Sequence, residues 1–306
     1  MSGVFAPDQP WARRLRERLG HSPAASRLRQ GWRRLRAPPV DGESIVADVE
    51  PASLSADQPF VFQCNLCGAP NAATLASLTR ESPSCAVCDS TVRSRAMAHL
   101  LTLEICGRPT ALPDAAVRKT IAGIGLSDAA AYALPLASLY SYENTWFDRR
   151  PRLDIADLPA SRVGRYDFVI ASDVFEHIAP PVAQAFANAR RLLRSGGRLI
   201  FSVPFSLEAD TREHYPELHD WSIALHEGVR TLVNRTADGR LQTFTDPRFH
   251  GGPGSTLEMR LFSRAALERE CARAGFARMR VAADPYLPFG IHWPAPWSVP
   301  MVACVD

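Results

Sequence analysis

The chain has 306 residues, of which 46% are hydrophobic, and a formal net charge of +3 at pH 7. This length accommodates one sizeable α/β domain with a small module beside it. No apolar run approaches the roughly 20 residues of a membrane-spanning helix, and no apolar segment follows the N-terminal charges, so we expect a cytoplasmic protein rather than a membrane or exported one.

The charge is unevenly distributed along the chain. Residues 1–40 contain nine arginines against Asp8 and Glu17, a net charge of +7, which leaves −4 for residues 41–306. A nucleic-acid-binding domain normally presents a basic face on its folded body. An acidic body with a basic arm therefore argues against a nucleic-acid partner.

The N-terminal arm has its own pattern. Residues 10–36 alternate arginine with leucine and tryptophan, which predicts one or two short basic amphipathic helices, and prolines and a glycine at 38–42 then break the pattern. We assign residues 1–58 to a basic arm and linker, solvated and in part disordered. Contact with an anionic membrane surface or with a partner protein through residues 10–36 stays open as an alternative.

Four cysteines form two C-x-x-C pairs that are separated by seventeen residues. They are Cys64, Cys67, Cys85 and Cys88. Each pair places two thiolates on a tight knuckle, and two knuckles supply the four sulfurs of a tetrahedral zinc site, although two incidental pairs of buried thiols are the alternative. Because all four ligands are cysteines, no position is open to water, and the zinc is expected to be structural. Residues 59–110 are interpreted as this zinc knuckle and a following helix.

From Lys119 onward, strands alternate with helices. The predicted strands are Lys119–Gly125, Tyr140–Asn144, Arg152–Ile155, Tyr166–Ser172, Arg198–Val203, Arg278–Ala283 and Pro300–Val305. The predicted helices are Thr91–Ile105, Ser127–Leu139 with a Ser-Asp cap, Val182–Leu193 and Ser263–Ala274. Continuous apolar strands interleaved with helices indicate a parallel sheet that is buried on both faces. We therefore expect residues 111–306 to form a doubly wound α/β domain with a mostly parallel, seven-stranded sheet.

Residues 205–256 interrupt this alternation. They are rich in His, Asp, Glu, Pro and Gly, and they show strand character around Arg230–Thr243. We interpret them as an insertion between one sheet strand and the next helix.

The segment Thr120–Ser127 is expected at the turn from the first strand of this domain to its first helix. Glycines at such a turn let the backbone approach a ligand closely, and the helix N-terminus that follows presents free amides. Two glycines, with Ser127 at the third position, are also compatible with a plain structural turn.

A longer block is more specific. The strand Tyr166-Asp-Phe-Val-Ile-Ala-Ser-Asp-Val-Phe-Glu-His177 is followed by a helix and by Leu193-Arg-Ser-Gly-Gly-Arg-Leu-Ile-Phe-Ser-Val-Pro204. This block resembles the core of class I S-adenosylmethionine-dependent methyltransferases, and the resemblance covers residues 119–204 and 256–305. It implies a Rossmann-like fold, methyltransferase activity and S-adenosylmethionine as cofactor.

The resemblance also implies roles for particular residues. Gly123 and Gly125 would line the methionine part of the cofactor, and Ser127 stands at the third glycine position of that motif. Glu143 would bind the ribose, and Asp154 or Asp157 would bind the adenine amino group. Ser172 and Asp173 would lie beside the sulfonium. The chain departs from the family pattern at two places in the first-strand motif, because it has no acid before the glycines and lacks the third glycine. A methyltransferase-like binding module without catalysis is therefore an alternative.

Methyl transfer requires alignment and proximity, and it requires a base when the acceptor is a hydroxyl. We look for that base in the insertion, at His214, His219 or His250, and interpret Glu176-His177 as structural or as a cofactor contact. The spacings of His214, His219, His226 and His250 match no His-x-x-x-His pair, so we do not expect a second metal site among them. The predicted function is methylation of a hydroxyl on a saccharide or another small molecule; an RNA methyltransferase with the knuckle as RNA reader is the alternative.

Overall fold

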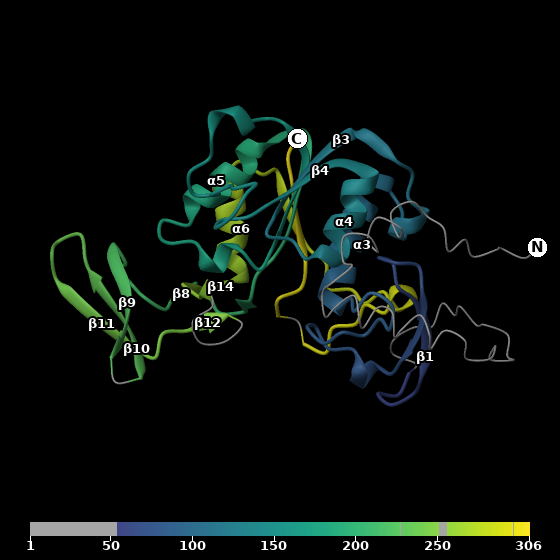
Figure 1. Ribbon diagram of the computed structural model, residues 1–306, viewed down its shortest axis with the longest axis horizontal. Coiled ribbons are helices and arrows are strands. Elements are labelled where there is room, and N and C mark those ends of the chain that lie inside the picture. Colours follow the sequence, from purple (N-terminus) through teal and green to yellow (C-terminus); the bar gives the residue numbers. More distant parts are fainter. Residues whose placement is uncertain (1–53, 227, 251–255, 296) are drawn as a thin grey trace, which may run out of the picture. The chain divides into compact units, whose positions relative to one another are not determined.

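The computed structural model describes residues 54–226, 228–250, 256–295 and 297–306 (Figure 1). The predicted basic helices over residues 10–36 and nearly all of the predicted linker lie outside these residues. The described chain divides into two compact units, here called unit 1 (residues 54–123, 128–143 and 283–295) and unit 2 (residues 124–127, 144–282 and 297–306, with the gaps just given). Within the described residues, no helix is long and apolar enough to span a membrane.

A six-stranded sheet has the strand order β15-β16-β6-β5-β3-β4. Its strands are β3 (Arg118–Leu126), β4 (Tyr140–Thr145), β5 (Tyr166–Ser172), β6 (Leu193–Ser202), β15 (Arg278–Val281) and β16 (Met301–Cys304). β5 and β6 pair in parallel, whereas β16 is antiparallel to both β6 and β15. The doubly wound α/β fold class is thereby confirmed, with a mixed sheet.

The sheet has six strands instead of the expected seven because Arg152–Ile155 does not form a strand. This segment makes a single bridge, between Arg152 and Trp146. The Asp154 carboxylate then accepts a hydrogen bond from the backbone N–H of Ala156 at 2.9 Å, an Asx turn that redirects the chain away from a ladder.

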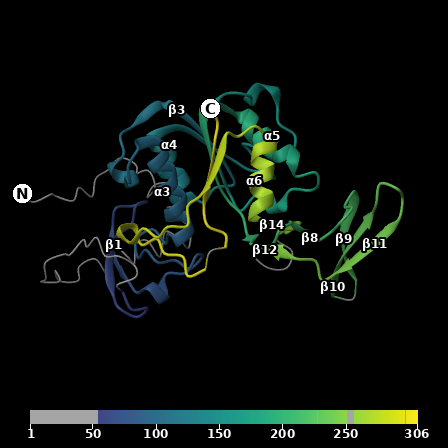
Figure 2. The same cartoon turned by 180° about the vertical axis from the view of Figure 1, so that it is seen from behind.

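The interior of unit 2 is built on β5 and β6. Residues 168–171 of β5 are all 0% exposed, so both faces of this strand are covered, as its continuous apolar sequence predicts. The helices and 3-10 helices of unit 2 are η4 (Ala160–Arg162), η5 (Phe175–His177), α5 (Ala183–Leu192) and α6 (Arg264–Arg273). α5 packs on β5, on β6 and on α6 (Figure 2), and Phe186 of α5 stacks on Phe175 with ring centroids 4.4 Å apart.

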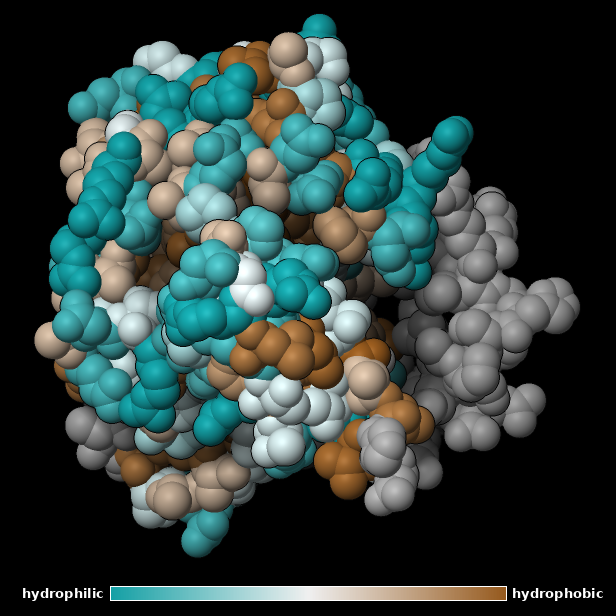
Figure 3. Space-filling view, turned by 90° about the vertical axis from the view of Figure 1, so that its left-hand side faces the viewer, coloured by the Kyte–Doolittle hydropathy of each residue, from teal (hydrophilic) through white to brown (hydrophobic). Residues whose placement is uncertain are grey.

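The predicted insertion contains short strands. They are β7 (Phe205–Ser206), β8 (Arg212–Glu213), β9 (Asp220–His226), β10 (Val229–Arg235), β11 (Leu241–Thr245), β12 (Phe249–His250), β13 (Thr256–Leu257) and, just beyond it, β14 (Arg260–Ser263). β9, β10 and β11 form a three-stranded antiparallel sheet, which confirms the expected strand character. Leu225 and Leu241 are each 66% exposed on it. Figure 3 views the molecule from the side on which this sheet lies in Figure 1, and hydrophobic side chains are visible there among hydrophilic ones.

Unit 1 contains the cysteine segment. Its elements, apart from strands of the large sheet, are β1 (Phe60–Gln63), β2 (Pro70–Ala73), η2 (Leu75–Ser77), α3 (Val92–Cys106), η3 (Leu112–Asp114), α4 (Ala130–Leu139) and η6 (Leu287–Phe289). α3 begins at a capping box between Thr91 and Ser94 and ends at Gly107, close to the predicted bounds.

A fully buried guanidinium, that of Arg95 on α3, organises this unit. Its Nε donates to the carbonyl of Phe289 at 2.9 Å, and its Nη2 donates to the carbonyl of Gly290 at 2.8 Å. Nη1 donates to the carbonyl of Ser90 at 3.0 Å, directly after the second cysteine pair, and the guanidinium lies 4.9 Å from the centroid of the Phe62 ring. One side chain therefore joins a helix, a hairpin, a cysteine knuckle and the turn after η6.

The predicted Ser-Asp cap of α4 is wrong. The helix begins at Ala130, and its N-cap Ala129 makes no side-chain hydrogen bond. The carboxylate of Asp128 is instead turned into the interior, where it accepts hydrogen bonds from the phenols of Tyr132 and Tyr142. Burial, partly offset by these two bonds, raises the pKa of Asp128 to about 7.

We predict that Gly290→Ala destabilises the protein more than Gly107→Ala. Both glycines have positive φ values, but a Cβ on Gly290 would lie 2.6 Å from the Phe62 ring, whereas one on Gly107 meets nothing within 4 Å. The shared backbone strain costs about 1 kcal/mol, and the clash adds about 1–3 kcal/mol. Urea unfolding of both variants measures the difference, and equal losses would contradict the packing described here.

A second prediction concerns pH. Because the pKa of Asp128 is about 7 in the folded protein and the ordinary pKa of an aspartate is 3.8, the folded state holds its proton to higher pH than the unfolded state does. This group therefore favours folding most below pH 4, and its contribution declines as the pH rises to about 7. The Asp128→Asn variant has no carboxyl group that titrates at this position and serves as the reference. The free energy of unfolding of wild type, minus that of the variant, should fall by at most about 1.4 kcal/mol per pH unit between about pH 4 and 7 and should stay constant above about pH 7. Denaturant unfolding from pH 4 to 9 tests this, and a constant difference would refute it.

Candidate functional site

The two cysteine knuckles have the same local geometry. In the first, the N–H of Gly68 donates to the carbonyl of Cys64 at 2.7 Å, with φ of +79° at Gly68. In the second, the N–H of Asp89 donates to the carbonyl of Cys85 at 3.0 Å, with φ of +54° at Asp89. The backbone therefore folds back behind each pair, and the side chains of each pair project from one tight turn.

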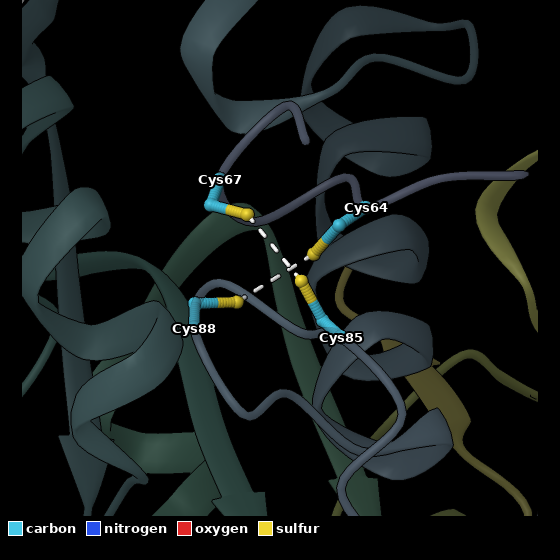
Figure 4. Close-up of side chains that lie close together, drawn as sticks. All are labelled: Cys64, Cys67, Cys85 and Cys88. Atoms are coloured by element: carbon cyan, nitrogen blue, oxygen red, sulfur yellow. Dashed lines mark hydrogen bonds between the residues drawn. The ribbon is translucent and has the colours of Figure 1, made fainter. Parts of the chain in front are cut away.

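The four sulfurs point toward one another (Figure 4). The Sγ atoms of Cys64 and Cys88 are 3.7 Å apart, and those of Cys67 and Cys85 are 3.6 Å apart. Four Zn–S bonds of about 2.3 Å in a tetrahedron separate the sulfurs by about 3.8 Å, while a disulfide would bring two of them to about 2.05 Å. The donor set and its spacing therefore fit a tetrahedral zinc ion.

The four thiols share hydrogen bonds that shift their pKa values in opposite directions. The hydrogen bond with Cys67 is the main reason that the pKa of Cys64 is lowered to about 7, and the hydrogen bond with Cys64 is the main reason that the pKa of Cys85 is lowered and that the pKa values of Cys67 and Cys88 are raised. Thiolates are the metal-binding form of cysteine. Burial lowers the pKa of Arg95, but all four cysteines oppose this effect and favour its charged form.

The glycine segment lies in a strand rather than in a turn. Gly123 and Gly125 both belong to β3, which continues to Leu126. The turn comes at Ser127, whose φ is +61° and whose N–H donates to the carbonyl of Thr145 at 2.7 Å. The Thr145 hydroxyl donates to the carbonyl of Gly125 at 2.8 Å, so the strand end is fixed by its neighbour. Ser127 thus adopts the left-handed conformation that a glycine at this position would adopt without strain.

A second strained residue follows the neighbouring strand β5. Asp173 has a φ of +54°, and its carboxylate accepts a hydrogen bond from the Ser202 hydroxyl at 2.7 Å. The hydroxyl of Ser172 is 3.2 Å from that of Ser202. Left-handed conformations of non-glycine residues cluster at functional sites, and the carboxyl ends of parallel strands are where α/β sheets bind ligands. The structure therefore gives Ser172 and Asp173 a fixed position at the edge expected for the cofactor.

The remaining predicted cofactor residues are less constrained. Glu143 is half-buried in β4, Asp154 is half-buried at its Asx turn, and Asp157 is exposed. Nothing in the geometry separates Asp154 from Asp157 as the adenine-binding residue.

The structure separates the three predicted catalytic histidines. His219 is exposed directly before β9, and its backbone N–H donates to the side-chain oxygen of Asn234 at 2.9 Å. His214 Nε2 lies 2.9 Å from Glu258 Oε1, and this hydrogen bond is the main reason that the pKa of Glu258 is lowered. His250 also favours the charged form of Glu258. His214 and His250 therefore belong to one polar region, and His219 does not.

His250 lies beside the Glu176-His177 pair of η5. His250 and His177 have ring centroids 5.3 Å apart, and both rings approach the buried carboxylate of Glu176. His177 Nδ1 is 2.8 Å from the carbonyl of Leu257, and burial lowers the pKa of His177. We call Glu176, His177 and His250 the Glu-His-His cluster.

A buried arginine holds η5 in place. Arg260, fully buried in β14, donates from Nη1 to the carbonyls of Phe175 and Ile178, at 3.1 and 2.6 Å, and from Nε to Glu213 at 2.7 Å. The N–H of Met259 adds a hydrogen bond of 2.8 Å to the carbonyl of Glu176. The backbone of η5 and of the residue after it is therefore fixed by the chain that leaves the insertion.

Sequence reasoning missed this convergence. His250 is 73 positions from His177, and Glu258 is 44 positions from His214, so no local spacing connects them. The one available signal was the Glu-His pair directly after a buried strand. In the sequence, the pair Glu176-His177 lies outside the insertion, so nothing connects it with the histidines of the insertion.

Comparison with known proteins gives the family. A family model described as a methyltransferase domain matches residues 102–280, more than half of the chain. Among curated proteins, the highly reducing polyketide synthase sor1 of Hypocrea jecorina (strain QM6a) is 33% identical to this chain over 112 residues. The match covers 30% of this chain and only 4% of the length of that enzyme.

One solved structure that matches is an S-adenosylmethionine-dependent methyltransferase from Clostridium acetobutylicum ATCC 824. The two chains are 11% identical with a TM-score of 0.39, and the match covers 70% of this chain and 90% of that chain. Another is the sugar N-methyltransferase KedS8 from Streptoalloteichus sp ATCC 53650, with 12% identity, a TM-score of 0.41 and coverage of 70% and 87%. The family match agrees with the Tyr166–Pro204 block and with the strand order of the sheet. The chain belongs to the methyltransferase-domain family.

Proposed function

We propose that this enzyme methylates a hydroxyl group on a saccharide or another small molecule. The observation that carries this proposal is the polar region of unit 2 that follows β5, where His214, Glu258 and the Glu-His-His cluster come together. A hydroxyl is a weak nucleophile until it loses its proton, so an oxygen acceptor needs a base in its site. The charge of −4 on residues 41–306 favours such an acceptor over RNA, whose phosphates call for a basic surface.

The cofactor supplies an electrophilic methyl group when bound. Its contacts are proposed to be those that the family resemblance implies, namely Gly123, Gly125, Ser127, Glu143, Asp154 or Asp157, Ser172 and Asp173. Support for the last two comes from their fixed geometry at the carboxyl end of β5. The acceptor is then expected beside η5, which begins two residues after Asp173.

We assign the base to His214. Its Nε2 faces Glu258 Oε1 at 2.9 Å, and a carboxylate can only accept, so Nε2 carries the proton and Nδ1 of the neutral ring keeps its lone pair. A base that is oriented by a carboxylate in this way is a recurring arrangement in enzymes. Nδ1 would accept the proton of the acceptor hydroxyl as that oxygen takes up the methyl group that the bound cofactor would supply.

The four cysteines are proposed to hold one structural zinc ion. Their thiolates fill all four positions, so this site stabilises unit 1 and takes no part in methyl transfer. Support comes from the matched knuckles and from sulfur separations of 3.6 and 3.7 Å.

We predict one zinc ion per chain in wild type and in Cys106→Ser, and less than one in Cys67→Ser. Cys106 is a half-buried thiol outside the knuckles and serves as the matched control. Because metal binding contributes to folding free energy, chelation should also lower the melting temperature of wild type. Native mass spectrometry and thermal unfolding provide the two readouts. Full zinc content in Cys67→Ser would rule out the four-cysteine site.

The methyl-transfer proposal is tested with S-adenosylmethionine labelled in its methyl group and a panel of saccharides and small alcohols. We predict that His214→Asn and Glu258→Gln each lower kcat, the first by about 10²–10⁴-fold, while the dissociation constant for the cofactor stays unchanged. Glu208→Gln is the control, since Glu208 makes an exposed ion pair with Arg212. Label transfer only to amines, or unchanged kcat in His214→Asn, would contradict the proposal.

A further inference from the structure

The Glu-His-His cluster joins two segments that are distant in sequence. Glu176 and His177 lie in η5, and His250 is the second residue of β12. His177 Nε2 is 3.8 Å from Glu176 Oε1, and His250 Nδ1 is 3.9 Å from the same oxygen. One potential ligand atom from each residue lies within 4.8 Å of the other two.

These distances are too long for hydrogen bonds. The same unit contains a direct histidine–glutamate hydrogen bond for comparison, that of His214 with Glu258, at 2.9 Å. The two imidazole nitrogens each lie 0.9–1.0 Å farther from one carboxylate oxygen of Glu176 than His214 lies from Glu258. Two bonds of about 2.1 Å to a shared metal ion span at most about 4.2 Å, so the observed distances are within that reach.

Burial makes a cation at this position favourable. The Glu176 side chain is 0% exposed, that of His177 is 13% exposed and that of His250 is 36% exposed. A buried carboxylate attracts positive charge more strongly than an exposed one, because the protein interior screens charge less than water does.

The hydrogen bond of His177 orients its ring for metal binding. The carbonyl of Leu257, 2.8 Å from Nδ1, can only accept, so Nδ1 carries a proton and Nε2 of the neutral ring presents its lone pair toward Glu176. Metal-binding histidines almost always donate their other ring N–H to a carbonyl or carboxylate in this way. β12 and β13 pair with His250 opposite Thr256, so the backbone that orients His177 also positions His250.

We propose that Glu176, His177 and His250 bind a divalent metal ion of the class that prefers imidazole and carboxylate ligands, such as Mn²⁺, Fe²⁺ or Co²⁺. Two imidazoles and one carboxylate leave coordination positions open, in contrast to the closed four-cysteine site. Resting on the proposed function, the open positions take oxygen atoms of the acceptor. The metal then lowers the pKa of the bound hydroxyl, and His214 receives the proton.

The test uses Mn²⁺ alone, without cofactor or acceptor, on full-length protein whose cysteines are saturated with zinc. Mn²⁺ prefers oxygen and nitrogen to thiolate ligands, and the loss of its free-ion electron paramagnetic resonance signal measures binding. We expect one Mn²⁺ per chain in wild type. Binding should weaken by at least about 10-fold in Glu176→Gln and in His250→Asn. Asp220→Asn, an exposed carboxylate in the same insertion, should bind as wild type does.

Both variants are needed because Glu176 is buried and its replacement can disturb η5, whereas His250 is partly exposed on a two-residue strand. Circular dichroism identifies any variant that has lost its fold. No saturable Mn²⁺ binding in wild type, or equal affinity in wild type and a folded His250→Asn, would overturn the proposal. Metal binding does not depend on methyl transfer, so a metal-binding protein that never methylates a hydroxyl would refute the proposed function alone.

Discussion

The buried guanidinium of Arg95 is the interaction on which unit 1 depends. It is fully buried, and its donors are used by the carbonyls of Ser90, Phe289 and Gly290. Removing one partner of a buried charge typically costs about 3–5 kcal/mol, so the cysteine segment and the turn after η6 hold each other through this side chain. Unit 2 uses the same kind of interaction, because Arg260 is also fully buried and donates to the carbonyl of Phe175, the first residue of η5, and to that of Ile178, directly after η5. In each unit, the hydrogen bonds of one buried arginine side chain fix backbone that lies outside the α-helices and β-strands.

The sequence predicted the elements whose determinants are local. β5 has the predicted bounds because an uninterrupted apolar run in an α/β chain is buried on both faces, and α3 follows its capping box. The two knuckles were foreseen for the same reason. Prediction failed where a tertiary contact competed with a local preference. Asp128 is a good capping residue by type, but two tyrosines from other positions engage its carboxylate, and Asp154 ends a segment that was expected to continue as a strand.

The candidate site shows the same division. Ser172 and Asp173 could be placed from the sequence because a parallel strand presents its carboxyl end at a defined edge. The pairing of His214 with Glu258, and of His250 with Glu176 and His177, depends on how the insertion returns to the sheet. A single sequence carries no signal for that path. Residue types were therefore predictable in the insertion, whereas their partners were not.

The pairing of β7 with β14 has a consequence for how this enzyme can diversify. Phe205 and Phe262 lie opposite each other in a parallel register, so the chain leaves the sheet and returns to it at neighbouring points. Because the ends are held together, lengthening or shortening the segment between them changes the loop-closure entropy only slowly. The β9–β11 sheet can therefore be exchanged for another with little effect on the strand that ends at Ser172 and precedes Asp173. The length and fold of the insertion are thus free to vary while the parallel strands stay the same.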